Sequence, residues 1–212
     1  IFYESSYLTD RSYRTREELS MKLSAKITAF LSSHGIIRTE DSEIYIYGFD
    51  LLIADVINFS LILLIGGLCR QLGSTIIYLM IFVGLRSACG GYHAKTHIKC
   101  HICTIGAYIA FLTMQSLVSF KPWILLLGNI IAAVPIVAFA PIPHGNKPLT
   151  AQVYRKNRII SILSVFILIV MTEVLCHYNR QEGITISLTL WIVSFSMIPA
   201  INFHSFILRR KQ

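Results

Sequence analysis

The sequence predicts an all-α, polytopic integral membrane protein with about six transmembrane helices. Of its 212 residues 54% are hydrophobic and only 14% are charged, and the mean hydropathy is +0.62. Soluble domains carry about 25% charged residues, which they need for a polar surface, so the composition argues against a soluble enzyme. The apolar residues also gather into six long runs, most of which can cross ~30 Å of hydrocarbon as a helix.

The first 48 residues form a separate, amphipathic segment. Thr15 and Glu18 have the spacing of a capping box, and from Leu19 onward apolar residues follow at helical intervals, with basic residues off that stripe. Gly35 is placed to end the helix. We expect this segment, residues 1–48, to lie on the cytoplasmic face of the membrane as an interfacial helix. A helix packed against the rest of the protein is an equal alternative.

Six apolar runs follow within residues 49–208, before a short tail at 209–212. Their bounds are Phe49–Cys69, Leu72–Leu85, Ile102–Phe120, Trp123–Ile142, Ile159–Tyr178 and Ile184–Leu208. The second run covers only roughly 21 Å as a helix, which leaves open whether it crosses fully. Because no repeat or low-complexity tract divides the chain, we expect one membrane domain over residues 1–212.

The positive charges predict the orientation. If all six runs cross, 16 of the 19 Lys and Arg residues fall on one side of the membrane. Basic residues gather on the cytoplasmic side of membrane proteins, so both termini are expected in the cytoplasm. Topology alone thus explains the formal charge of +8. The expected partner of this charge is the lipid bilayer, and we expect no nucleic acid.

Histidines and cysteines are concentrated between the second and third runs. Residues 86–103 hold three of the seven histidines and three of the five cysteines. One interpretation is a metal site in the His/Cys cluster at 93–103, where Cys100-x-x-Cys103 resembles half a zinc clip. No second pair with zinc-ligand spacing occurs elsewhere, and we therefore expect no metal and no cofactor.

The other interpretation is a cysteine nucleophile at the membrane edge. A thiol at Cys100 needs a base to become a thiolate at neutral pH, and a neighbouring histidine can remove its proton. His97 lies three residues from Cys100, whereas His93 lies seven residues away, ~10.5 Å along a continuous helix. Helical spacing alone favours His97, and His93 requires a bend in the chain.

The pattern Arg86-x3-Gly90-Gly91-x-His93-Ala-x5-Cys100 resembles the accessory gene regulator protein B (AgrB) family. The resemblance covers most of the chain and includes a second loop, with the segment Asn-Lys-Pro-Leu at 146–149. The family consists of membrane cysteine peptidases of Gram-positive bacteria. The resemblance implies that Cys100 is the nucleophile and His93 the general base, with Arg86, Gly90 and Gly91 as further motif positions.

The resemblance also implies the substrate, an AgrD-like quorum-sensing propeptide with an acidic C-terminal tail. A membrane-embedded endopeptidase would remove this tail through a Cys-linked thioester and promote closure of a thiolactone or lactone ring. The basic cytoplasmic face would attract the tail. Candidate contacts are Lys147, Arg155, Lys156 and Arg158. The family further implies location in a Gram-positive cell membrane and a homodimer.

Two alternatives come from other functional classes. A transporter of a peptide or ion would carry paired ionisable residues near the middle of the membrane. Asp55 and Glu173 lie within apolar runs, but a position near the membrane interface also explains them. A membrane metal-binding protein would instead use the His/Cys cluster at 93–103.

Overall fold

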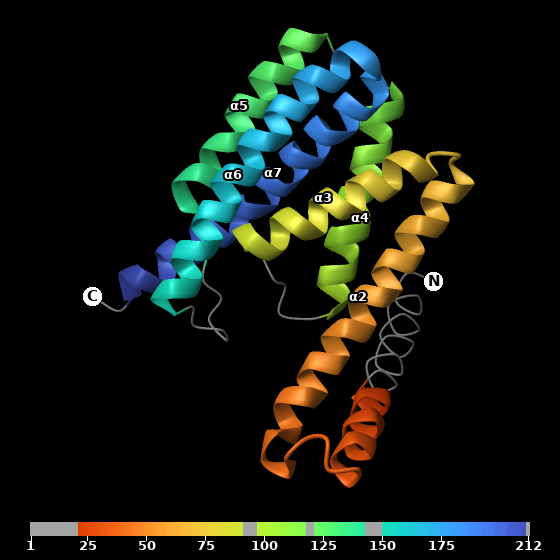
Figure 1. The fold of residues 1–212 in the computed structure, drawn as a ribbon, viewed down its shortest axis with the longest axis vertical. Coiled ribbons are helices and arrows are strands. Elements are labelled where there is room, and N and C mark those ends of the chain that lie inside the picture. Colours follow the sequence, from red (N-terminus) through yellow and green to blue (C-terminus); the bar gives the residue numbers. More distant parts are fainter. Residues whose placement is uncertain (1–20, 91–96, 118–120, 143–149, 211–212) are drawn as a thin grey trace, which may run out of the picture. The chain divides into compact units, whose positions relative to one another are not determined.

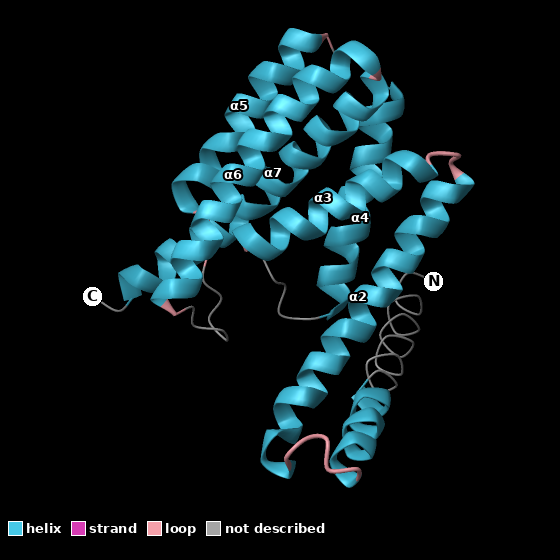
Figure 2. Ribbon diagram, viewed as in Figure 1, coloured by secondary structure: helices cyan, strands magenta, loops and turns pink. Residues whose placement is uncertain are grey.

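The computed structural model describes residues 21–90, 97–117, 121–142 and 150–210, apart from the side chains at 97–100 and 200–210. This part of the chain consists of helices joined by turns and contains no strand, which confirms the all-α prediction (Figures 1 and 2). A 3-10 helix, η1 (Thr39–Asp41), is followed by α2 (Ser42–Leu68), α3 (Leu72–Cys89), α4 (His97–Leu117), α5 (Pro122–Phe139), α6 (Ala151–Tyr178) and α7 (Arg180–Arg210).

Each predicted apolar run falls on one of the helices α2 to α7. Five segments are long and apolar enough to cross a membrane, and they are Thr39–Leu68, Leu72–Cys89, Pro122–Phe139, Ala151–Tyr178 and Arg180–Pro199. A sixth, His101–Leu117, is a shorter apolar helix. The chain is therefore a multi-pass membrane protein.

The helices extend beyond several of the predicted apolar runs. α3 continues to Cys89, so its 18 residues span about 27 Å. The second predicted run, which is short for a full crossing on its own, therefore belongs to a helix that is long enough to cross the membrane. α6 starts well before its run, because Thr150 acts as N-cap and accepts a hydrogen bond from the Val153 N–H at 3.4 Å. Hydropathy marks the membrane-crossing part of a helix, whereas capping and backbone hydrogen bonds set its ends.

The chain divides into two compact units, residues 1–62 with 94–105 and residues 63–93 with 106–212. In the first unit, residues 21–33 are helical and end at Gly35, whose φ is +69°. The Gly35 N–H donates to the Ser32 carbonyl and the Ile36 N–H to the Leu31 carbonyl, both at 3.0 Å. These two bonds form a Schellman motif, which confirms Gly35 as the predicted stop.

The helix at 21–33 exposes its apolar side. Leu23 is 48% exposed and Phe30 60%, whereas Ser24 and Thr28 are buried and hydrogen-bond to carbonyls of their own helix. Apolar side chains on the outside suit contact with lipid. The position of this helix on the membrane surface stays a prediction, as does the expectation of a single domain.

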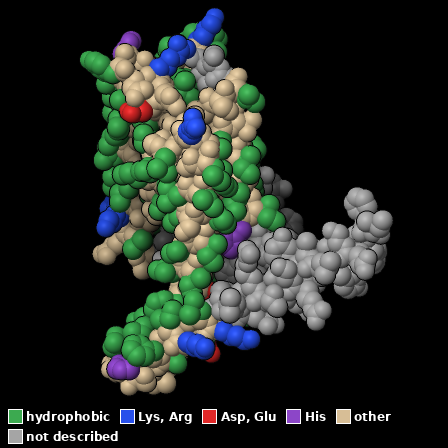
Figure 3. Space-filling view, turned by 90° about the vertical axis from the view of Figure 1, so that its right-hand side faces the viewer, with side chains coloured by type: hydrophobic (Ala, Val, Ile, Leu, Met, Phe, Trp, Pro, Cys, Tyr) green, Lys and Arg blue, Asp and Glu red, His purple; other side chains and the backbone are tan. Residues whose placement is uncertain are grey.

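In the second unit α7 is the central helix. It packs against α3, α5 and α6, and α5, α6 and α7 lie side by side (Figure 1). Residues 185–190 of α7 are all buried, which requires neighbours on every side of the helix. Large exposed hydrophobic side chains lie on α3, α5 and α6, and on α7 beyond this buried stretch, at Phe195 and Ile198. Hydrophobic side chains also predominate on the face shown in Figure 3, where charged ones are few.

Polar side chains join the helices inside the second unit. Gln115 Nε2 donates to Ser74 Oγ at 2.9 Å and to Thr185 Oγ1 at 3.1 Å, which connects α4 to α3 and α7. Trp191 Nε1 of α7 donates to Asn129 Oδ1 of α5 at 2.9 Å. Lipid tails are as apolar as leucine, so hydrogen bonds and close packing, more than burial of apolar surface, hold such helices together.

Candidate functional site

The expected nucleophile, Cys100, lies in the first described turn of α4. Its side chain lies outside the described residues, as does the side chain of His97. The segment 91–96, which contains His93 and Gly91, lies outside them altogether. The choice between His93 and His97 as the base therefore stays a prediction.

Arg86 is held at the end of α3 by an aromatic cluster. Its guanidinium carbon lies 5.5 Å from the centroid of the Phe82 ring, one helical turn earlier, in a cation–π contact. Phe82 stacks on Tyr78, which in turn contacts Tyr108 and Phe111 of α4, with centroid distances of 5.2 and 4.7 Å. A cation in the last turn of a helix also interacts favourably with the helix dipole. An aromatic cluster of the second unit thus supports the Arg86 side chain.

Gly90 ends α3 in a conformation that favours glycine. Its φ is +74° and ψ −171°, and its N–H donates to the Arg86 carbonyl at 3.0 Å. A Cβ at this position would lie 2.7 Å from the carbonyl oxygen of Ile142, and the Ile142 N–H donates to the Cys89 carbonyl at 3.0 Å. The end of α3 and the segment after α5 therefore lie backbone against backbone.

This contact, the Gly90–Ile142 junction, brings together two segments that carry the family resemblance. One is the Arg86-x3-Gly90 motif, and the other begins at Ala140, joined to Pro141 by a cis peptide bond. Lys147, further along the second segment, lies outside the described residues. Of the remaining candidate contacts in the first turns of α6, Arg155 and Lys156 are exposed and Arg158 is half-buried.

The described part of the chain gives little support to the metal-site interpretation or to the transporter interpretation. No group of three or more His, Cys, Asp and Glu side chains that could hold a metal occurs among the described residues, but most of the cluster at 93–103 lies outside them. Asp55 is exposed on α2. One carboxylate oxygen of Glu173 is buried on α6 without a hydrogen-bond partner in the described part. The free thiol of Cys103 is exposed.

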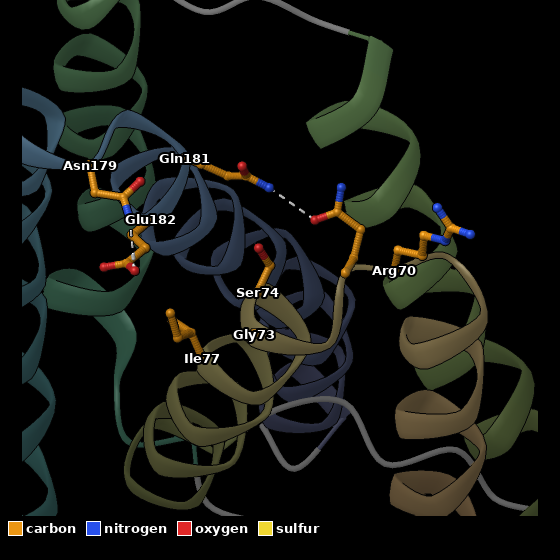
Figure 4. Close-up of a pocket in the computed structure, with 8 residues that line it drawn as sticks. Arg70, Gly73, Ser74, Ile77, Asn179, Gln181 and Glu182 are labelled. Carbon is orange, nitrogen blue, oxygen red and sulfur yellow. Dashed lines mark hydrogen bonds between the residues drawn. The ribbon is translucent and has the colours of Figure 1, made fainter.

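A polar pocket of about 230 Å³ lies at the end of α3 away from the junction (Figure 4). Gln181 Nε2 donates to Gln71 Oε1 at 3.0 Å beside it, and Asn179 Nδ2 donates to Glu182 Oε1 at 2.9 Å. In Figure 4 the Arg70 side chain points away from the other lining residues. The full lining consists of Arg70, Gln71, Gly73, Ser74, Ile77, Asn179, Gln181 and Glu182.

None of the predicted site residues lines this pocket. It is about 27 Å from Gly90, the length of α3. The residues that line the pocket come from the α2–α3 and α6–α7 turns and their neighbours, so these two turns lie close together. The Gly90–Ile142 junction lies at the other end of α3. This arrangement agrees with the predicted topology, in which successive connections between helices lie on alternate sides of the membrane.

Asn58 is a polar residue that the sequence reasoning overlooked. Its side chain is 3% exposed on α2, and its Oδ1 lies 2.6 Å from Nδ1 of His101, the residue after Cys100. The sequence signal for this residue is an uncharged amide inside an apolar run, where ionisable residues are the more conspicuous exceptions. The bond joins α2 to the start of α4 within the first unit.

Comparison with known proteins identifies the family. The family model described as Accessory gene regulator B matches residues 24–198, which include the whole segment from Arg86 to Cys100. The chain belongs to the AgrB family. This membership confirms the resemblance seen in the sequence and relates the protein to accessory gene regulator quorum sensing.

Individual relatives are distant. Accessory gene regulator protein B of Staphylococcus intermedius is 26% identical over 127 residues, 59% of this chain and 65% of that protein. A putative AgrB-like protein of Clostridium perfringens strain SM101 is 25% identical over 190 residues, 84% of this chain and 86% of that protein. The match thus covers slightly less than two thirds of the staphylococcal relative. No solved structure matches the chain significantly.

Proposed function

We propose that this AgrB-family protein is a membrane-embedded cysteine endopeptidase that removes the C-terminal tail of an AgrD-like propeptide. The observation that carries the proposal is the family match over residues 24–198, because it spans the complete motif from Arg86 to Cys100. The proposal includes a Gram-positive cell membrane, cytoplasmic termini and a homodimer. Its partners are the propeptide and the lipid bilayer.

In the proposed reaction the Cys100 thiolate attacks the carbonyl carbon of the scissile peptide bond. His93 takes the thiol proton and returns it to the nitrogen of the leaving tail as the C–N bond breaks. The remaining peptide is then a thioester on the Cys100 sulfur. A thiol within the substrate attacks this thioester, releases Cys100 and closes a thiolactone ring, whereas a substrate hydroxyl would close a lactone.

The chemistry explains the choice of a cysteine. Exchange of one thioester for another is nearly balanced in free energy, so ring closure needs no additional energy source. An enzyme serine would form an oxygen ester, which is a poorer acyl donor. Exclusion of water at the edge of a membrane would also slow hydrolysis of the intermediate.

Two described features support the assignment. α3 stops at Gly90, so the chain leaves the helix before it reaches His93. The Gly90–Ile142 junction brings this stop against the residues that precede Lys147 in the sequence, where the acidic tail is expected to bind. The basic residues in the first turns of α6 follow soon after Lys147 in the sequence.

The test is covalent trapping on the purified protein with a synthetic propeptide. We expect the parent to release the tail and to form a mass adduct at Cys100, and Cys100→Ala and Cys100→Ser to do neither while inserting normally into membranes. Cys103→Ala is the matched control, because it removes an exposed thiol on the same helix. Near-normal cleavage by Cys100→Ala would refute the proposal, and complete loss in Cys103→Ala together with release of bound zinc would favour the metal interpretation.

A further inference from the structure

Asn58 is a buried amide within an apolar run of the sequence. It lies on α2 between Ile57 and Phe59 and is 3% exposed. An amide that is removed from water without a hydrogen-bond partner is costly, so its partner determines which arrangement of the helices is stable. Two buried hydroxyls in the same unit, those of Ser24 and Thr28, bond to carbonyls of their own helix. Asn58 instead bonds to a side chain 43 residues away.

The partner is the imidazole of His101, at 2.6 Å between Nδ1 and Oδ1. The Oδ1 atom of an amide only accepts hydrogen bonds, so Nδ1 is the donor and carries the proton. The bond thereby requires a proton on Nδ1 and restrains the plane of the ring. Because His101 lies at the end of the first described turn of α4, the bond also fixes how this turn is rotated about the helix axis.

The rotation of this turn also determines where the backbone of the neighbouring residue, Cys100, lies. Successive helical residues are separated by a fixed angle about the helix axis, so the angular position of His101 sets that of the Cys100 Cα atom. With a Cα radius of about 2.3 Å, a rotation of about 20° displaces a Cα atom by about 0.8 Å. A misplacement of about 1 Å at a reacting group can reduce a rate by about a hundredfold.

We propose that Asn58 is a positioning residue that acts through His101 to hold the turn of α4 on which Cys100 lies. The proposal rests on the proposed function, because it takes Cys100 as the nucleophile. Neither Asn58 nor His101 is required to touch the propeptide. Loss of the bond therefore lowers the rate of acylation and leaves binding of the propeptide almost unchanged.

The test compares three variants of the full-length protein in the same membrane mimetic. Asn58→Leu keeps the shape of the side chain but removes the acceptor, and Asn58→Asp keeps an acceptor oxygen. Asn129→Leu is the matched control, because Asn129 is also a buried amide, hydrogen-bonded to Trp191 and Ser187 in the other unit. The measurements are kcat and KM for propeptide cleavage, per folded protein, and the iodoacetamide reaction rate of Cys100 followed by mass spectrometry of its peptide.

We expect Asn58→Leu to lower kcat roughly 10- to 100-fold with KM within about twofold, and to change the alkylation rate of Cys100 at least threefold. Asn58→Asp should recover most of the lost kcat, and Asn129→Leu should leave both measurements of the folded protein near the parent values. His101→Leu should match Asn58→Leu, and the double variant should lose no more than either single one.

Parent-like kcat and alkylation in Asn58→Leu would overturn the positioning role. So would an equal loss of kcat in Asn129→Leu, because the effect would then be general destabilisation, or additive losses in the double variant. Alkylation needs no propeptide, which keeps the two proposals separable. A parent protein that fails to cleave refutes the proposed function, while the alkylation rates still decide the role of Asn58.

Discussion

The Gly90–Ile142 junction makes a quantitative prediction for Gly90→Ala. The backbone at Gly90, with φ +74° and ψ −171°, costs about 1–3 kcal/mol for a residue with a side chain. The added Cβ would also lie 2.7 Å from the Ile142 oxygen, which is backbone and has little freedom to move. Overpacking of this kind costs about 1–3 kcal/mol. The two effects together predict a destabilisation of about 2–6 kcal/mol.

Gly84→Ala is the matched control on the same helix. A Cβ at Gly84 meets no atom within 4 Å, and replacing a helical glycine by alanine stabilises by about 0.5–1 kcal/mol. For a chain of this size the expected loss for Gly90→Ala corresponds to a drop in Tm of about 4–24 °C. The control should show no drop.

Hydrogen exchange of the Ile142 amide is the sharpest assay, because this N–H donates directly to the Cys89 carbonyl. A local loss of about 3 kcal/mol would raise its exchange rate by about a hundredfold. Propeptide cleavage should fall in parallel if the junction also contributes to propeptide binding at Lys147. A Gly90→Ala protein whose Ile142 amide stays as protected as in Gly84→Ala would refute the reasoning.

Two further predictions concern the reaction. If His93 is the base, His93→Ala should abolish acylation and shift the alkylation profile of Cys100 to higher pH, because an imidazolium that stabilises the thiolate lowers the thiol pKa. The same shift in His97→Ala alone would instead assign the role to His97. If charge attracts the acidic tail, added salt should raise KM more than it lowers kcat, since screening acts over about 8–10 Å. Neutralising the basic residues should mimic the salt effect, and these residues are Lys147, Arg155, Lys156 and Arg158. A KM that is independent of salt would show that they do not contribute to propeptide binding.

Hydropathy located the membrane helices because a run of some twenty apolar residues has few alternatives in a cell. The stop at Gly35 was also predictable, since a left-handed residue after a helix favours glycine. Hydropathy did not identify the central helix, because lipid and protein interior are similarly apolar. The sequence feature that marks the central helix is its lower hydropathy. Arg180–Pro199 has a mean hydropathy of only 1.4, against 2.7 for Ala151–Tyr178, and it is the most buried of the five spans.

The candidate site, like the fold, was predictable from the sequence only in part. The sequence by itself determined the membrane class, the approximate spans and the motif from Arg86 to Cys100, because these depend on residue type and local spacing. Only the tertiary structure placed Ile142 against Gly90 and His101 against Asn58. Both contacts join segments more than 40 residues apart, and their existence depends on how whole helices pack. Local spacing along one chain carries no record of that packing.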